Sequence, residues 1–97
     1  MYAAVRKYKT TPGAVSTLIQ RVQEGFVSII SQVPGFVAYY ALDTGNDTVA
    51  SISVFDDQAG AEASTRKAAD WVKQNLADLV QGAPEITAGE VVIYQAK

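Results

Sequence analysis

Apolar side chains recur along this chain with two different periods. At nearly every second position they recur in residues 2–9, 36–42, 48–55 and 86–96, which predicts four strands. At helical spacing they recur in residues 12–33 and again from residue 57 to about residue 80, which predicts two long helices. Glycine and proline stand at most of the boundaries, as expected where one element stops and the next begins.

The two central strands are apolar on both faces. Residues 43–47, Asp-Thr-Gly-Asn-Asp, separate them and are typical of a hairpin turn. Strict alternation in the first of the two strands predicts one face with Phe36, Ala38, Tyr40 and Leu42, and an opposite face with Val37, Tyr39 and Ala41. A sheet that is wet on one side alternates apolar with polar residues, so this pair of strands requires a covering layer on each face.

The order strand, helix, strand, strand, helix, strand predicts an α+β fold of the ferredoxin-like split βαβ type, β-α-β-β-α-β. In it a four-stranded antiparallel sheet carries both helices on one face. With 97 residues, the chain is expected to be one domain spanning residues 1–97, and it is too short to cover both faces of the sheet. We therefore expect the helix-free face to be buried in a homodimer, in which two copies pack sheet to sheet.

Three features of the helices bear on a binding site. Gly25 falls on the apolar stripe of the first helix, where it predicts a close approach, either for packing or for a ligand. Asp56 and Asp57 precede the second helix and are interpreted as capping carboxylates. The second helix has small side chains toward the sheet, Ala61 and Ala68, which leave room for a pocket.

Charge and composition exclude several classes of protein. The net charge of −2 argues against nucleic acid as a partner. The densest basic cluster, Arg6, Lys7 and Lys9, is interpreted as the charges of a solvated edge strand. No run of about 18 apolar residues predicts a membrane span, and no apolar leader follows the first basic residues, so we expect a cytoplasmic protein.

The chain contains neither cysteine nor histidine. Thiolate and imidazole metal sites, a proximal-histidine haem and every Ser-His or Cys-His catalytic arrangement are therefore excluded. Tyrosine is the only strong axial ligand left for haem iron, because the single methionine is Met1. We expect no metal and no cofactor, and in particular neither tight binding nor degradation of haem.

The residues that remain as candidates for chemistry are aromatic, amide and cationic. Trp71 and Asn75 lie one helical turn apart, where an indole can stack on an aromatic ring and an amide can donate to a phenolate. The other interpretation of Trp71 is that it covers the sheet edge or the dimer seam. Of Tyr39 and Tyr40, which strict alternation places on opposite faces, at most one lines a pocket under the helices.

Strand one offers a cation and a phenol on one face. Arg6 and Tyr8 are two residues apart, so both side chains project the same way and can orient an acidic substrate. Their other interpretation is simple surface exposure.

Several local phrases resemble the antibiotic biosynthesis monooxygenase domain of the dimeric α+β barrel group. They are Pro34-Gly35-Phe36 at the entry to the second strand, Phe55-Asp56-Asp57-Gln58 after the third, and Trp71 in the second helix. The resemblance spans nearly the whole chain. It implies a cofactor-independent oxygenase of aromatic compounds, or a quinol-forming or quinol-consuming relative, with Phe55 and Ala68 beside the substrate.

The chain departs from that family pattern at two places. Many members carry tryptophan at the end of the third strand, where this chain has Phe55, and histidine in the second helix, where this chain has none. The haem-degrading branch, which uses that histidine as its iron ligand, resembles the chain least.

Two functions of different class stay open. One is a small monooxygenase or related redox enzyme acting on a phenol or quinol without a bound cofactor. The other is a non-catalytic dimeric domain that binds a small apolar ligand or serves as an assembly scaffold. An enclosed cavity between the second helix and the sheet favours the first, and a filled core favours the second.

Overall fold

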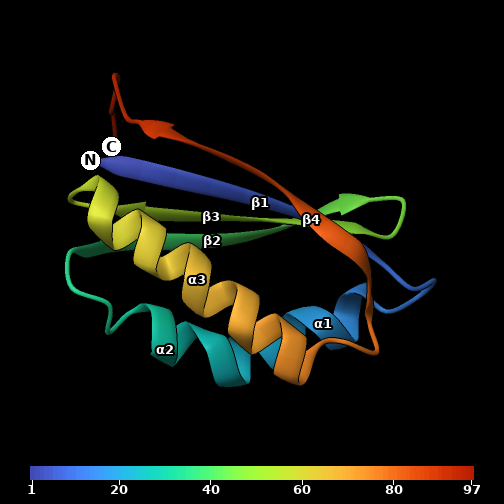
Figure 1. Cartoon of the computed structure of the whole chain (residues 1–97). Helices are drawn as coiled ribbons and strands as arrows, with labels where there is room; N and C mark the ends of the chain where they lie inside the picture. The colour runs from blue at the N-terminus through green and yellow to red at the C-terminus, as the bar shows by residue number, and fades with distance from the viewer.

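The computed structural model covers residues 1–97 and places all helices on one side of a single sheet (Figure 1). The elements in chain order are β1 (Tyr2–Thr10), α1 (Val15–Arg21), the π-helical turn η1 (Val22–Phe26), α2 (Val27–Ile30), β2 (Phe36–Gly45), β3 (Thr48–Phe55), α3 (Gln58–Asn75) and β4 (Val80–Glu90). The four strands are antiparallel and lie in the order β2-β3-β1-β4. This confirms the predicted ferredoxin-like α+β fold.

Strand β1 lies in the middle of the sheet, not at its edge. It pairs with β3 on one side and with β4 on the other, so that Arg6 stands opposite Ser51 and also opposite Ile86. The interpretation of Arg6, Lys7 and Lys9 as the charges of an edge strand is therefore wrong, because β1 is central. Arg6 is buried beneath the helices, while Lys7 and Lys9 are exposed on the other face.

A bulge at Val37 changes which face the side chains of β2 occupy. Phe36 pairs with Phe55 and Tyr39 pairs with Ser53, so one extra residue lies between them. Phe36 and Tyr39 therefore share the helix-covered face. The strict alternation expected from the sequence, which placed Phe36 with Tyr40, is wrong at this point.

The first helical segment is shorter than predicted and contains an irregular turn. It begins at Val15 rather than Pro12, after a turn in which Ala14 N–H donates to the Thr11 carbonyl over 3.1 Å. It ends at Ile30, and the π-helical turn in its middle contains Gly25. A π turn adds a residue to the helix and is common near functional sites.

The second helix and the last strand are displaced from their predicted bounds. Helix α3 begins after Asp57, whose carboxylate accepts from Gly60 N–H at 2.9 Å, which confirms the capping role, but it ends at Asn75. Strand β4 begins at Val80 because a register shift opposite Tyr8 lets it continue across Gly82 and Pro84.

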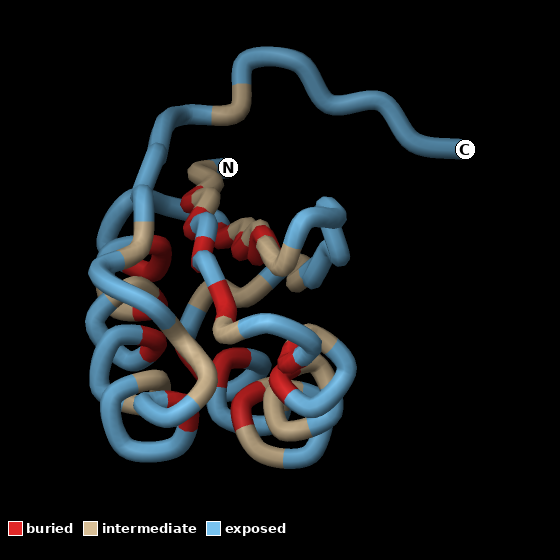
Figure 2. The backbone as a smooth tube through the Cα atoms, turned by 90° about the vertical axis from the view of Figure 1, so that its right-hand side faces the viewer, coloured by how far each residue is buried: buried red, intermediate tan, exposed pale blue.

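The segment after β4 leaves the sheet, although residues 91–96 were predicted to belong to the last strand. The Val91 N–H donates to the Met1 carbonyl over 2.8 Å, and beyond it the chain runs away from the body (Figure 2). Val92 and Ile93 are 88% and 85% exposed.

The core between the helices and the sheet is divided into two apolar clusters. One is built around Phe26, Ile30 and Phe55, and the other around Tyr8, Leu18, Val49 and Leu76. On the sheet, the buried polar side chains Arg6, Ser51 and Ser53 occupy the strand positions between the clusters. Trp71 packs against both clusters from α3. No helix of the chain is both long and apolar enough to cross a membrane.

Candidate functional site: an apolar pocket with one buried cation

A pocket lies where the two apolar clusters meet, between the sheet and the helices. Its volume is about 40 Å³, and 13 of its 15 lining residues are hydrophobic. The sheet contributes Arg6, Tyr8, Tyr39, Ala41, Val49, Ala50 and Ser51; α1 and η1 contribute Leu18, Ile19, Val22 and Phe26; α3 contributes Ala68, Trp71, Val72 and Leu76. Of the two small side chains that predicted room between helix and sheet, Ala68 lines this pocket and Ala61 does not.

Trp71 forms one wall of this pocket. The centroid of its indole lies 5.4 Å from the Phe26 ring at an interplanar angle of 46°. Gly25 in η1 lets the helix backbone approach the indole closely, because a Cβ at that position would lie 2.8 Å from Trp71 Cζ2. Gly25 thus packs against the pocket wall rather than against a ligand. Trp71 is half-buried, so it belongs both to the core and to the pocket.

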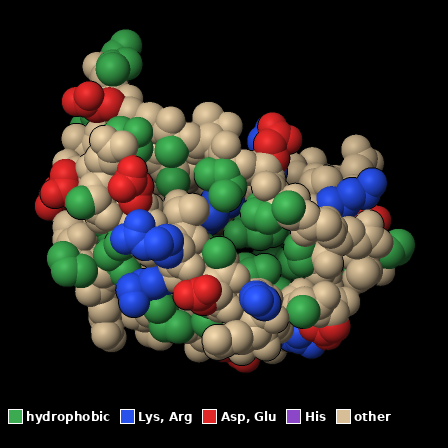
Figure 3. Space-filling model, in the orientation of Figure 1, with side chains coloured by type: hydrophobic (Ala, Val, Ile, Leu, Met, Phe, Trp, Pro, Cys, Tyr) green, Lys and Arg blue, Asp and Glu red, His purple; other side chains and the backbone are tan.

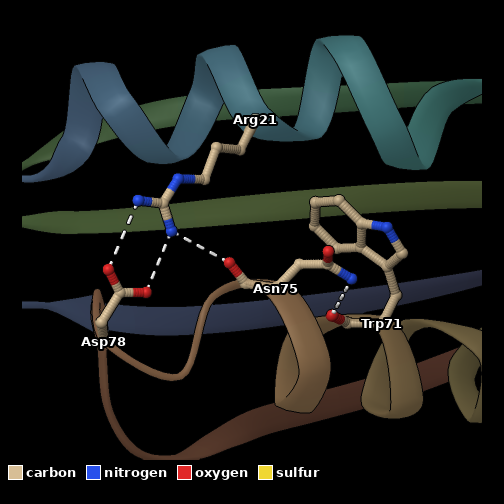
Figure 4. Close-up of polar contacts among 4 residues, drawn as sticks. All are labelled: Arg21, Trp71, Asn75 and Asp78. Atoms are coloured by element: carbon tan, nitrogen blue, oxygen red, sulfur yellow. Dashed lines mark hydrogen bonds and ion pairs between the residues drawn. The ribbon is translucent and has the colours of Figure 1, made fainter.

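Asn75 does not face the pocket with Trp71, contrary to what helical spacing suggested. Its side-chain amide donates to the Trp71 backbone carbonyl over 2.9 Å (Figure 4). The backbone carbonyl of Asn75 accepts a hydrogen bond from Arg21 at 3.0 Å, and Arg21 forms an ion pair with Asp78 at 2.9 Å. Asn75 therefore ties the end of α3 to α1 at the surface.

The structure distinguishes the two hairpin tyrosines. Tyr39 lines the pocket and its ring meets Phe26 edge-on, with 5.8 Å between centroids. Tyr40 points to the helix-free face and is 55% exposed. Phe55, a predicted substrate contact, is fully buried against Phe36, outside the pocket lining.

Arg6 is the one charged side chain in the pocket, and it is only 1% exposed. Its Nη2 donates to Ser53 Oγ at 2.7 Å and its Nη1 donates to Thr65 Oγ1 at 3.3 Å. The buried Arg6 Nε has no hydrogen-bond partner, and neither has the hydroxyl of Ser51 on the opposite strand. Surface exposure, the other interpretation of Arg6, is ruled out.

Two phenols lie near this guanidinium. Burial raises the pKa of Tyr8 above its usual value of 10.0, and the positive charge of Arg6 opposes the shift only in part. Burial likewise raises the pKa of Tyr39, against the lowering effect of the positive charge of Arg6. Both phenols are therefore neutral at physiological pH.

Ser51 was missed by the sequence analysis, although a signal was available. Ser51 and Ser53 alternate with Ile52 and Val54 in β3, and polar residues on the buried face of a strand are unusual. Together with Arg6 on the neighbouring strand, they mark the polar layer between the two clusters.

A second hollow lies between α3 and the strands β1 and β4. Figure 3 shows this side of the molecule, with a hollow whose walls are hydrophobic beside α3. The second hollow measures about 330 Å³ and is lined by Tyr2, Ala4, Ala61, Glu62, Thr65, Arg66, Ile86 and Ala88. It is larger and more open to solvent than the pocket at Trp71. No group of three or more acidic, histidine or cysteine side chains gathers anywhere to hold a metal ion.

Comparisons with known proteins agree with this fold. The family described as antibiotic biosynthesis monooxygenase matches residues 1–70. A Nitrosomonas europaea protein of unknown function has a TM-score of 0.84 at 23% identity, covering 99% of this chain and 93% of that one. A Chloroflexus aurantiacus protein described as a candidate antibiotic biosynthesis monooxygenase has a TM-score of 0.71 at 22% identity, covering 98% and 96%.

A variant of MhuD, with two manganese protoporphyrin IX bound per active site, has a TM-score of 0.78 at 15% identity and full coverage of both chains. At these identities the solved structures establish the fold alone. No curated protein matches the chain.

Proposed function

This chain belongs to the antibiotic biosynthesis monooxygenase family, and on that premise we propose that it is a cofactor-independent monooxygenase of a small, electron-rich phenol or quinol. The observation that carries the proposal is the pocket between helices and sheet, with aromatic walls from Phe26, Tyr39 and Trp71 and one cation in its floor. Such a pocket excludes water from an aromatic ring while offering donors to its oxygen.

The size of the pocket favours a compact substrate. A cavity of about 40 Å³ holds a few water molecules. A single aromatic ring fits only when half-buried wall residues such as Trp71, Ile19 and Val72 shift outward. We therefore expect one-ring phenols to be better ligands than polycyclic ones.

The reaction proposed for this site consumes dioxygen and needs no other reactant. A phenolate passes one electron to dioxygen, and the two radicals combine at the para carbon to form a hydroperoxide. The O–O bond of the hydroperoxide then breaks, and the outer OH leaves as water together with the hydrogen of the para carbon, which gives a quinone. One oxygen atom of dioxygen thus enters the product and the other leaves as water. The contribution of the protein is to stabilise the phenolate at Arg6 and to hold the ring between Trp71 and Tyr39.

The donor set does not fit haem, although the fold occurs in a protein that binds a metalloporphyrin. The pocket has no imidazole or thiolate, and its two phenols, Tyr8 and Tyr39, are held neutral by burial. A neutral phenol is a poor axial ligand compared with tyrosinate. We expect hemin titration to give no sharp, saturable Soret shift at one site per subunit.

We further propose that two copies pair through the helix-free face of the sheet. That face presents Tyr40 and Leu42, which are 55% and 44% exposed, beside the half-buried Val5, Ile52 and Val54. The exposed Lys7 and Lys9 lie on the same face, toward its β2–β3 hairpin end. An apolar face of this kind is unusual on a monomer and is covered when a second copy packs against it. The pocket lies on the opposite side of the sheet, so each copy keeps its own.

A non-catalytic ligand-binding domain is the second candidate function. The observation in its favour is that no Asp, Glu, His or Lys side chain lines the pocket, so no conventional general base is present. A domain of this kind binds the same ligands but turns none of them over.

Guaiacol, a one-ring phenol with a free para carbon, separates the two functions. We expect the protein to bind it, with quenching of Trp71, the only tryptophan, and to convert it to the methoxyquinone with uptake of isotope-labelled dioxygen into the product. In Trp71→Phe the rate should fall about two- to tenfold, because roughly 0.5–1.5 kcal/mol of aromatic stacking is lost.

Gln74→Ala, on the exposed side of the same helix, is the control and should turn over like the wild type. Saturable quenching without any dioxygen uptake assigns the ligand-binding function. If neither quenching nor dioxygen uptake is observed, the pocket does not have the proposed role.

A further inference from the structure

The pocket contains a buried positive charge that no carboxylate neutralises. Arg6 is 1% exposed, and its two hydrogen bonds go to the neutral hydroxyls of Ser53 and Thr65. The ion pair that the structure contains, Arg21 with Asp78, lies at the surface. An arginine side chain stays charged in proteins, and burying an unpaired charge is costly. Buried arginines are therefore normally paired with a carboxylate, and Arg6 has no such acidic partner.

No group in the pocket carries a negative charge that could neutralise Arg6. No Asp or Glu side chain lines it. The ionisable groups nearest to the guanidinium are the phenols of Tyr8 and Tyr39, and burial keeps both protonated by raising the pKa of each. The charge of Arg6 is thus left for something that enters from outside the chain.

Two hydrogen-bonding groups are also left without partners at this place. The Nε of Arg6 and the hydroxyl of Ser51 are both buried, and both residues line the pocket. The two residues stand directly opposite each other in the pairing of β1 with β3, so their side chains are neighbours on the helix-covered face. A charged N–H and an adjacent hydroxyl are the donor pair that recognises an anionic oxygen.

We propose that the ligand of this pocket is an organic monoanion, in which a negatively charged oxygen lies against Arg6 Nε and Ser51 Oγ and an apolar body lies between Trp71 and Tyr39. The ligand class is an oxyanion on a flat apolar body, which includes acidic phenolates, enolates and aryl carboxylates. This inference rests on the pocket of the proposed function, and it defines which phenols qualify as substrates.

The absence of a general base then has a chemical reason. A substrate that is already ionised when it binds, or that ionises under the field of Arg6, needs no residue to remove its proton. The pocket should accordingly bind phenols whose acidity is raised by an acyl or nitro substituent more tightly than it binds plain hydroquinones.

Calorimetric binding of three one-ring probes tests the inference. For para-nitrophenolate and benzoate we expect affinities about 10- to 100-fold above that of neutral nitrobenzene, which corresponds to one charge-assisted hydrogen bond of roughly 1.5–3 kcal/mol. In Arg6→Met this preference should vanish, with nitrobenzene still bound. Arg66→Met removes an exposed arginine of α3 and should leave the preference intact.

Each outcome of the titrations has a definite meaning. Preference for nitrophenolate over benzoate assigns phenolates, and the reverse preference assigns carboxylates. Equal affinities for charged and neutral probes in the wild type overturn the inference while leaving the proposed function intact. Failure of every probe to bind overturns both.

Thermal unfolding of the wild-type protein gives a second readout that does not require the Arg6→Met variant to fold. Benzoate should raise the melting temperature, since a ligand that binds only the folded state stabilises it. Nitrobenzene at the same concentration should raise it less. A melting temperature that responds equally to both probes would contradict the inference.

Discussion

Gly25 and Trp71 hold each other in place at the pocket wall. Alanine normally stabilises a helix by about 1 kcal/mol relative to glycine. In Gly25→Ala, however, the added Cβ would lie 2.8 Å from Trp71 Cζ2, so the indole must move. We expect a net loss of stability of about 1–3 kcal/mol, the usual cost of overpacking, and a shifted Trp71 emission.

A double-mutant cycle tests the origin of that loss. In the Trp71→Phe background the outer ring that carries Cζ2 is gone, so Gly25→Ala should become neutral or stabilising. Urea unfolding of the four proteins measures the coupling between the two positions. Equal costs in both backgrounds would show that the strain arises elsewhere.

The buried phenols predict a loss of stability in alkali. Burial raises the pKa of Tyr8 and Tyr39 above 10.0, so the unfolded chain releases these protons at a lower pH than the folded one. Above pH 10.0 the unfolded state binds fewer protons, and the free energy of unfolding therefore falls as the pH rises further. Below that pH the two tyrosines contribute no pH dependence.

Urea unfolding of the wild type and Tyr39→Phe, measured at neutral and at strongly alkaline pH, tests this expectation. The variant should lose less stability between the two conditions, because it lacks one of the titrating phenols. Parallel losses in the two proteins would remove Tyr39 from the alkaline transition.

The role of Arg6 could be predicted from the sequence in part. Spacing placed it on one face with Tyr8, and both do line the pocket. Its burial could not be inferred, because a cluster of basic residues in a short first strand suggests an edge, and only the order of the strands shows that β1 is central. Asn75 shows the converse error: helical spacing placed it beside Trp71, but its amide was used locally.

At the scale of elements, α3 depends on its cap. The Asp57 carboxylate accepts the Gly60 N–H at 2.9 Å, and it is this residue, not the neighbouring Asp56, that caps α3. We expect Asp57→Ala to lower the free energy of unfolding by about 0.5–2 kcal/mol. Asp56→Ala is the matched control and should cost much less. Chemical denaturation of both variants compares them, and equal losses would mean that Asp57 does not act as a cap.

The sequence predicted for each of the six elements whether it is a helix or a strand. The predicted bounds of the elements were wrong where the backbone is irregular. The extra residue Val37 moves Phe36 to the face of Tyr39, and a second register shift carries β4 across Gly82 and Pro84. Apolar periodicity assumes a regular strand, so it cannot register an inserted residue. Glycine and proline were taken as the end of an element where they only bend one.

At the scale of the whole molecule, the proposed dimer is the main prediction. Sedimentation at micromolar concentration should give twice the mass of the 10.3 kDa chain. Tyr40→Glu places a charge in the exposed apolar face and should shift the protein toward monomer. Gln74→Glu, on an exposed part of α3, should not. A wild-type protein that sediments as a monomer would refute the pairing.

The overall architecture followed from the sequence because it depends on order and length. Six alternating segments in a chain of 97 residues allow few arrangements, and the split βαβ plan is the one found. The pocket did not follow with the same detail. It depends on the Val37 bulge, the π turn at Gly25 and the central place of β1, none of which leaves a periodic signal.

The segment after β4 is an exposed, aggregation-prone stretch of the subunit. Val92, Ile93 and Tyr94 form a run of high strand propensity, yet they lie outside the sheet, in which β4 is an edge strand. Unpaired apolar backbone of this kind templates the addition of further strands. Purified subunits at high concentration should therefore be prone to runaway strand exchange, and solubility should depend on this short segment more than on the globular body.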